Sequence, residues 1–330
     1  RRTTCEIDPA GTPRRRVALI TDGTESARMA PTWEDFGALG RLLAYVRPTF
    51  MLPAVGMSAY GAALAPASSF DLVFAVLHAV TVGLALFVAH LRDGLVDGHV
   101  RGEETPLLSV AAFRWSIGVG AAVVLALAAI LLVAGGVITA ASAIALLALA
   151  LLHAPYLDRH PLTVTVDYPL GIGIALVGGY ATQTGGVAVG VVAVATAFGA
   201  LLSGIKIGID RLDAAFDSTI EKRTVPVAYG TPNADRIAFG VFGGTALLTA
   251  GFGAAGVAGT VALVPAFAFA AAAVPVGCLA ATALATDERA VQIQMALTYV
   301  FAVLLFLSTC SGECAGLDLL QRALEALSGS

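Results

Sequence analysis

Two short stretches of the chain carry ionisable side chains at the spacing of a helical face. The first stripe consists of His90, Asp93 and Asp97, directly after a long apolar run. The second stripe consists of Asp210, Asp213 and Asp217, each 120 positions after its counterpart (90 to 210, 93 to 213, 97 to 217). Offsets of three, four and seven residues fall on one face of an α-helix, because a turn takes about 3.6 residues. We therefore expect two stripes in the same helical register.

Five carboxylates brought together without a cation would repel one another. A single aspartate at a helix end is usually an ordinary solvated residue, but two matched stripes favour a shared site. Hard divalent cations prefer carboxylate oxygens, and Mg²⁺ typically joins one or two carboxylates to substrate phosphates. The pattern predicts Mg²⁺ held for a diphosphate, with these metal-binding and catalytic residues: Asp93, Asp97, Asp210, Asp213 and Asp217.

Basic residues beside the stripes are candidates for binding the diphosphate. Arg101 lies just beyond the first stripe, Lys222 and Arg223 follow the second, and Arg159 lies in a short loop. Each has an alternative role as a topology determinant facing lipid headgroups. As a set, they would neutralise a leaving diphosphate electrostatically.

Three further residues complete the predicted substrate-binding set. Asp167, two residues before Pro169, either orients an acceptor or caps a helix. Tyr156 either contacts substrate or is an aromatic residue of the membrane interface. His90 belongs to the first stripe.

The composition is that of a membrane protein. The 330 residues are 58% hydrophobic and 13% charged, with a mean hydropathy of +0.85. Soluble domains carry about 25% charged residues, so a helical bundle in a membrane is favoured over two soluble domains. Glycine is abundant within the apolar runs, as expected where helices approach closely in lipid. The net charge of −4 and the absence of a basic surface argue against nucleic-acid binding.

Apolar runs of the right length predict an all-α bundle of about nine transmembrane helices. A bilayer core of about 30 Å needs roughly 20 residues per helix. The expected spans are 46–67, 70–90, 114–134, 137–154, 163–184, 186–208, 237–257, 260–285 and 290–309.

The distribution of positive charge predicts the orientation. Of the 19 Lys and Arg residues, all but Arg322 lie in the N-terminal segment or at the connections after even-numbered spans and their borders. Cytosolic loops carry this excess of positive charge, so the N-terminus and both stripes are expected to be cytosolic. We predict an integral protein of the cell (plasma) membrane with its site on the cytosolic side.

The remaining segments predict the domain organisation. Residues 1–30 are expected to form a disordered cytosolic tail. An amphipathic helix over 31–45, capped by Thr32, precedes the nine spans of a domain at 31–310. Residues 311–330 form an extracytosolic tail, near which Cys310 and Cys314 either pair, if that side is oxidising, or stay free thiols.

The two stripes and their surroundings resemble the UbiA superfamily of intramembrane prenyltransferases. The first motif of that family reads NDxxDxxxD, and the chain reads AHLRDGLVDGHV over 89–100. The second motif reads DxxxxxxD followed by GKRTLP, and the chain reads DRLDAAFDSTIEKRTVPV over 210–227. The Arg-Pro pair at 47–48 is similar to the Arg-Pro that often opens the first helix in this family. The resemblance covers about residues 40–310.

The resemblance implies a nine-helix bundle with both motifs in cytosolic loops. It also implies a Mg²⁺-dependent transferase that moves a polyprenyl group from its diphosphate to a lipophilic acceptor. Such an enzyme belongs to the transferases of alkyl or aryl groups other than methyl. A quinone ring, a glycerol phosphate ether lipid, haem, a chlorophyll-type ring and a carotenoid all stay open as acceptors. The partners expected are this donor, this acceptor and membrane lipids, and no oligomeric state is predicted.

The chain departs from the family pattern at Ala89 and His90, which replace Asn and the first Asp, and at Glu221, which replaces Gly. A neutral imidazole is a poorer Mg²⁺ ligand than a carboxylate. Two alternative functions therefore stay open: a secondary transporter, and a catalytically silent homologue that binds isoprenoid lipid. Transporters more often place ionisable residues at the bilayer midplane, which favours the enzyme.

Overall fold

The computed structural model describes residues 6–7, 13–14, 37–220, 222–310 and 312–328. Most of the predicted N-terminal tail, and the predicted helix start at Thr32, lie outside these residues. Glu6–Ile7 (β1) and Pro13–Arg14 (β2) pair as a short antiparallel ribbon. The predicted amphipathic helix is represented by α1 over Gly37–Leu43.

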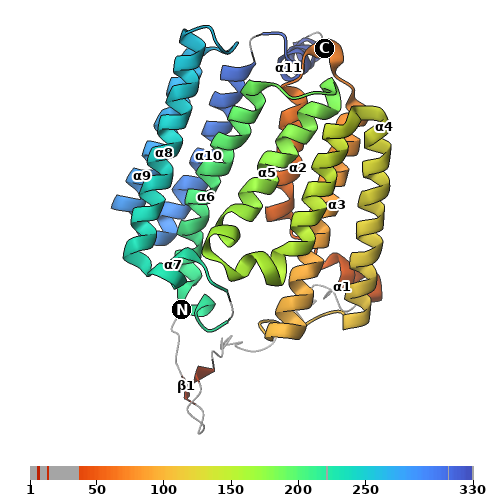
Figure 1. Cartoon of the computed structure of the whole chain (residues 1–330), viewed down its shortest axis with the longest axis vertical. Helices are drawn as coiled ribbons and strands as arrows, with labels where there is room; N and C mark the ends of the chain where they lie inside the picture. Colours follow the sequence, from red (N-terminus) through yellow and green to blue (C-terminus); the bar gives the residue numbers. More distant parts are fainter. Residues whose placement is uncertain (1–5, 8–12, 15–36, 221, 311, 329–330) are drawn as a thin grey trace.

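The rest of the described chain is a bundle of helices, so the predicted all-α class is confirmed (Figure 1). The helices are α2 (Pro48–Ala63), α3 (Leu72–Val96), α4 (Val110–Tyr156), α5 (Pro161–Thr184), α6 (Val189–Asp217), α7 (Val225–Tyr229), α8 (Thr231–Val257), α9 (Pro265–Leu284), α10 (Asp287–Thr309) and α11 (Ala315–Ser328). Shorter turns cover Ala67–Ser69, Asp97–Arg101 and Leu157–Arg159.

Seven of the described helical segments are long and apolar enough to cross a membrane. The first predicted span corresponds to α2, which has only 16 residues. Two predicted spans lie within α4, which is interrupted at Gly136 by a φ of 83° and a ψ of −178°. Glycine adopts this conformation without strain, so the chain turns back here between two antiparallel limbs (Figure 1). The number of crossings and the side of the N-terminus stay predictions.

The core is built mainly around α6. Phe198 of this helix packs edge-on against Phe301 of α10 at 5.2 Å between ring centroids, and both side chains are almost fully buried. Phe242 of α8 lies against Gly204, where a Cβ would come within 2.6 Å of the ring. The packing of α6 fixes the helix whose last turns carry the second stripe.

Glycines bring α2 and α5 into backbone contact, as the composition predicts. A Cβ on Gly61 would lie 1.9 Å from the Leu176 carbonyl oxygen, and one on Gly179 would lie 2.0 Å from the Ser58 carbonyl oxygen. Both clashing atoms belong to the backbone, which cannot move aside as the end of a flexible side chain could. The two helices therefore depend on these glycines for their separation.

We expect Gly61→Ala to destabilise the protein by about 1–3 kcal/mol, because the added methyl group overpacks a backbone contact. Thermal unfolding in detergent measures the effect. Gly56→Ala on the same helix is the matched control, since a methyl group added there would have no neighbouring atom within 4 Å. An equal effect of the two substitutions would contradict the close-approach argument.

Candidate functional site

The aspartates of both stripes lie at helix ends rather than in loops, and only the part of the second motif after Asp217 lies in a connection. His90 and Asp93 belong to α3, and Asp97 opens a wide helical turn that ends at Gly102 with a φ of 69°. All three aspartates of the second stripe lie within α6. Gly94 lets the ring of Tyr45 pack against α3 between Asp93 and Asp97, since a Cβ at this position would lie 2.3 Å from the ring. The predicted helical register of each stripe is thus confirmed.

Arg101 is the centre of an ion-pair network beside the first stripe. Its guanidinium donates to Asp97 Oδ1 at 3.2 Å and to Asp158 Oδ2 at 2.5 Å. Its Nε also lies 3.7 Å from Glu103 Oε1. Only 5% of the Arg101 side chain is exposed, so a buried cation is matched by three carboxylates.

Lys222 extends this network to the second stripe. Its Nζ lies 3.3 Å from Glu103 Oε2, and it also interacts electrostatically with Asp97 and Asp217. The loop that carries Lys222 is fixed to the α4–α5 connection, because Arg223 N donates to the Asp158 carbonyl oxygen at 3.1 Å. The two stripes therefore lie at the same end of the bundle, and Lys222 lies in the connection that follows the second one.

Burial and neighbouring charge shift the pKa values of Glu103 and Lys222. Burial raises the pKa of Glu103; the Lys222 ammonium opposes this effect and the Asp97 carboxylate adds to it. Burial lowers the pKa of Lys222, but the carboxylates of Asp97 and Glu103 outweigh it and leave the pKa raised. Lys222 is therefore a fixed positive charge in the site.

His153 joins the first stripe to α5. Its Nδ1 donates to Asp167 Oδ2 at 2.5 Å, and its Nε2 lies 3.6 Å from Asp93 Oδ1. The backbone N–H of Tyr168 donates to the second oxygen of Asp167 at 2.6 Å. Asp167 thus faces the first stripe through His153, and the imidazole holds α3, α4 and α5 together at this end.

The second stripe differs in exposure along its length. Asp210 and Asp217 are buried, at 3% and 6% exposure, and Asp213 is exposed. Lys206, one turn before Asp210, pairs with Asp210 Oδ1. The other oxygen of Asp210 is buried without a hydrogen-bond partner.

The residues fit Mg²⁺ by chemistry, although they do not form a ready-made cage. Among the described residues, no three His, Cys, Asp or Glu side chains are grouped so as to hold a metal ion. Asp93 Oδ1 and Asp210 Oδ2 are nevertheless buried carboxylate oxygens without hydrogen bonds, one on each stripe. Mg²⁺ commonly takes only one or two protein carboxylates and completes its shell with water and phosphate oxygens. Each stripe has at least the one or two carboxylates that such a Mg²⁺ ion needs.

Of the remaining predicted residues, three cationic ones share a depression and Tyr156 lies apart from the carboxylates. Arg159, Lys222 and Arg223 line an open depression of about 490 Å³ together with Ser218, Ile220 and Val227. Three cationic side chains around one depression suit an anion. Tyr156 is 59% exposed at the end of α4 and lies outside the hydrogen-bond and ion-pair network of the described carboxylates.

His90 is buried within α3, one turn before Asp93. It is 6% exposed, its Nδ1 has no hydrogen-bond partner, and its ring lies edge-on to Phe50 at 6.3 Å between centroids. The residue thus lies next to the first stripe, with its ring packed against Phe50.

We expect His90→Asp to preserve or raise the affinity for Mg²⁺, because it adds a carboxylate one turn from Asp93. The Mg²⁺ concentration that gives half-maximal activity measures this, and it should fall or stay constant. His90→Asn is the matched control, with a similar volume and no charge. A collapse of activity in His90→Asp would mean that the imidazole has a role of its own.

Four further residues belong to the site that the sequence motifs do not identify: Glu103, His153, Asp158 and Lys206. Lys206 has a usable signal in the sequence, because it lies four residues before Asp210 at the end of an apolar run. His153 likewise ends an apolar run on the same side as the stripes. Glu103 and Asp158 lie in connections, and only the packing of those connections brings them to Arg101.

Fold and site together define a helical membrane bundle with an acidic and cationic end. No protein-family model and no curated protein matches the chain. Several solved structures, however, match the chain. A UbiA homologue from Archaeoglobus fulgidus bound to GPP and Mg²⁺ matches with a TM-score of 0.64 and 15% identity, over 81% of this chain and 98% of that one.

Two further structures match similarly. A digeranylgeranylglyceryl phosphate synthase gives a TM-score of 0.61 at 14% identity, over 82% of this chain and 98% of that one. The apo structure of a UbiA homologue from Aeropyrum pernix K1 gives a TM-score of 0.60 at 19% identity, over 79% of this chain and 98% of that one. At these identities the likeness establishes the fold. The chain therefore has the fold of the UbiA homologues, as the motifs predict.

Proposed function

We propose that the protein is an intramembrane prenyltransferase of the UbiA type. It transfers a polyprenyl group from its diphosphate to a lipophilic acceptor, with Mg²⁺ bound between the two aspartate stripes. The observation that carries the proposal is that both stripes lie at one end of an apolar bundle, beside a depression lined by Arg159, Lys222 and Arg223. The solved structures of this fold bound to Mg²⁺ with GPP or DMAPP support the choice of ligand class.

In this mechanism the carboxylates bind the metal and the cationic side chains bind the diphosphate. Asp93 in α3 and Asp97 directly after it, with Asp210, Asp213 and Asp217 on α6, would hold Mg²⁺. When bound, Mg²⁺ supplies charge neutralisation at the diphosphate oxygens. Lys222, Arg223 and Arg159 line the depression beside the stripes and bind the same anion. The positive charge of Lys222 stabilises the leaving diphosphate as the carbon–oxygen bond breaks.

The other residues position the carboxylates. Arg101 holds Asp97 in place through a buried ion pair. His153 links Asp93 to Asp167 and so positions both carboxylates. The apolar helices exclude water, which would otherwise capture the allylic cation in place of the acceptor.

The proposal includes an orientation with the acidic end in the cytosol. The excess of Lys and Arg at that end supports it. So does the disulfide between Cys310 and Cys314 at the opposite end, because disulfides persist in oxidising compartments.

The test is release of diphosphate from geranylgeranyl diphosphate by the purified protein with a membrane lipid extract, with and without Mg²⁺. Mass spectrometry of the lipid fraction runs alongside and identifies the acceptor. We expect Mg²⁺-dependent release together with a new prenylated mass. The absence of release with donors of several lengths would overturn the proposal.

One observation favours a second candidate, a catalytically silent protein that binds isoprenoid lipid. The packed imidazole of His90 stands where the family motif has its first carboxylate. Such a protein would bind geranylgeranyl diphosphate in a Mg²⁺-dependent manner and release no diphosphate, so the same assay separates the two candidates.

A further inference from the structure

We propose that α11 is a membrane-surface helix. It would lie on the face of the bilayer opposite the acidic site, with its leucines in the lipid, and a disulfide-closed loop would hold it against the end of the bundle. The partner is the bilayer surface itself, bound through apolar side chains. This inference does not depend on the proposed enzymatic activity.

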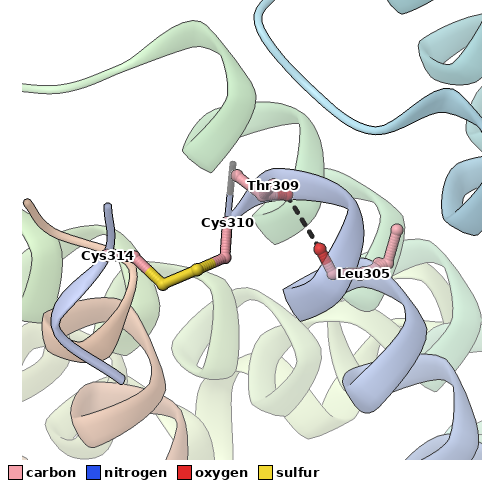
Figure 2. The surroundings of a disulfide bond; sticks show 4 residues. All are labelled: Leu305, Thr309, Cys310 and Cys314. Carbon is pink, nitrogen blue, oxygen red and sulfur yellow. Dashed lines mark hydrogen bonds between the residues drawn. A yellow bond between two sulfur atoms is a disulfide. The ribbon is translucent and has the colours of Figure 1, made fainter. Parts of the chain in front are cut away.

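The loop before α11 is fixed to two helices at this end of the bundle (Figure 1). Figure 2 shows Cys310, directly after the last turn of α10, bonded to Cys314, which precedes α11. On the other side of the loop, Ala67 N donates to the Glu313 carbonyl oxygen at 2.9 Å, and Ala315 N donates to the Ala65 carbonyl oxygen at 2.8 Å. The start of α11 is thus bound to the segment directly after α2 as well as to α10.

The first turn of α11 packs closely on the bundle. A Cβ on Gly316 would lie 2.5 Å from the ring of Phe306 and 3.2 Å from the methyl group of Ala63. Leu317 packs against the main hydrophobic cluster. The direction in which Leu317 points is therefore the direction of the apolar interior.

The apolar stripe continues beyond the bundle on the same face. Leucines recur at offsets of three, four and three residues, at Leu317, Leu320, Leu324 and Leu327. Those offsets place them on the face that packs at Leu317. Leu320 and Leu324 are nevertheless 55% and 58% exposed. An apolar face that begins in the core and continues into the open is typical of a helix at a membrane interface.

The level of α11 along the bundle identifies lipid as the occupant. The ends of membrane helices on this side of the bundle also expose large apolar side chains. Leu72 and Val73 at the start of α3 are 65% and 70% exposed, and Val137 at the turn of α4 is 72% exposed. A bilayer that covers these residues continues directly onto the leucines of α11.

The polar face of α11 is satisfied within the helix. Arg322 pairs with Asp318 at 3.0 Å, and Gln321 Nε2 donates to Glu325 Oε1 at 2.9 Å. The described helix carries two acidic residues and one basic residue, so anionic lipid gives it no electrostatic attraction. Binding should therefore rest on the buried apolar area and occur on neutral lipid.

The test uses tryptophan reporters in the full-length protein, reconstituted in vesicles of neutral phosphatidylcholine. Both native tryptophans, Trp33 and Trp115, are first replaced by phenylalanine. One reporter is Leu324→Trp in the leucine stripe. The matched control is Ala326→Trp, two residues further and on the opposite face of the same exposed helix. Phosphatidylcholine brominated in its acyl chains quenches tryptophan in lipid, and acrylamide quenches tryptophan in water.

We expect brominated lipid to quench Leu324→Trp at least twofold more strongly than Ala326→Trp, and acrylamide to show the reverse order. Adding anionic phosphatidylglycerol should leave the ratio unchanged. Equal quenching of the two reporters would overturn the proposal. So would shielding of Leu324→Trp from both quenchers, which would indicate a contact with a second copy of the chain, and so would a requirement for anionic lipid.

The role of the loop is tested by introducing Cys310→Ser and Cys314→Ser together into both reporter proteins. Loss of the covalent closure should lower the ratio of lipid quenching between the two reporters, because α11 is then held less firmly. An unchanged ratio would overturn the role of the disulfide. Thermal unfolding of the bundle in detergent shows whether the double variant is folded.

Discussion

Replacing Asp97 or Asp217 by asparagine is expected to lower prenyl transfer by ~100-fold or more in each case, the size of effect seen when one preorganised electrostatic group is removed. Asparagine keeps the volume of the side chain and removes the charge that binds Mg²⁺. Asp97 directly follows α3 and Asp217 ends α6, so each lies at the end of its helix on the same side of the bundle. A shared cation site therefore requires both of them. Diphosphate release at saturating donor measures the loss.

Two controls separate a lost ligand from a lost fold. Asp318→Asn removes an aspartate at the opposite end of the bundle, where it pairs only with Arg322 among the contacts of the described residues, and should leave the activity unchanged. Thermal unfolding in detergent should be similar in all three variants. Raising the Mg²⁺ concentration should partly restore Asp97→Asn and Asp217→Asn. Full activity in either variant would contradict a site shared by the two stripes.

Hydropathy and glycine positions are enough to predict most of the fold. Each apolar run forms a helix because lipid offers no other partner for backbone N–H and C=O groups. The turn at Gly136 follows from a Gly-Gly pair between two apolar runs. Helix α11 is not predicted, since its leucine spacing lies in a segment whose low overall hydrophobicity is typical of a tail. Its position depends on the loop at Cys310–Cys314, whose pairing the sequence leaves open.

The candidate site is predictable where it follows helical periodicity. The spacing of the aspartates locates both stripes, and the family resemblance locates Lys222 and Arg223. The partners of these residues come from packing between connections. Nothing in the spacing indicates that Glu103 would lie against Lys222, or that His153 would stand between Asp93 and Asp167. Such contacts depend on where three helices end relative to one another, and sequence periodicity carries no such information.

The contact between Lys222 and Glu103 leads to opposite expectations for the two partners. Lys222→Met should lower kcat/KM for the prenyl diphosphate by about 10- to 100-fold, because a charge-assisted hydrogen bond contributes about 1.5–3 kcal/mol. Glu103→Gln should instead lower the KM for the same donor, since the carboxylate competes with the diphosphate for Lys222 at 3.3 Å. Steady-state kinetics with donor varied at fixed Mg²⁺ measures both.

The pH dependence gives the Glu103 variant a second signature. Burial raises the pKa of Glu103, so this carboxyl becomes neutral at a higher pH than an ordinary glutamate. As the pH falls through that pKa, the wild-type protein loses the competing charge, and its KM for the donor should fall towards that of Glu103→Gln. The variant has no such carboxyl and should lose this part of the profile. Glu104→Gln, next to it but paired with Arg47 and 40% exposed, should keep the wild-type profile. If Glu103→Gln raised the KM instead, Glu103 would be a support for Lys222 and not its competitor.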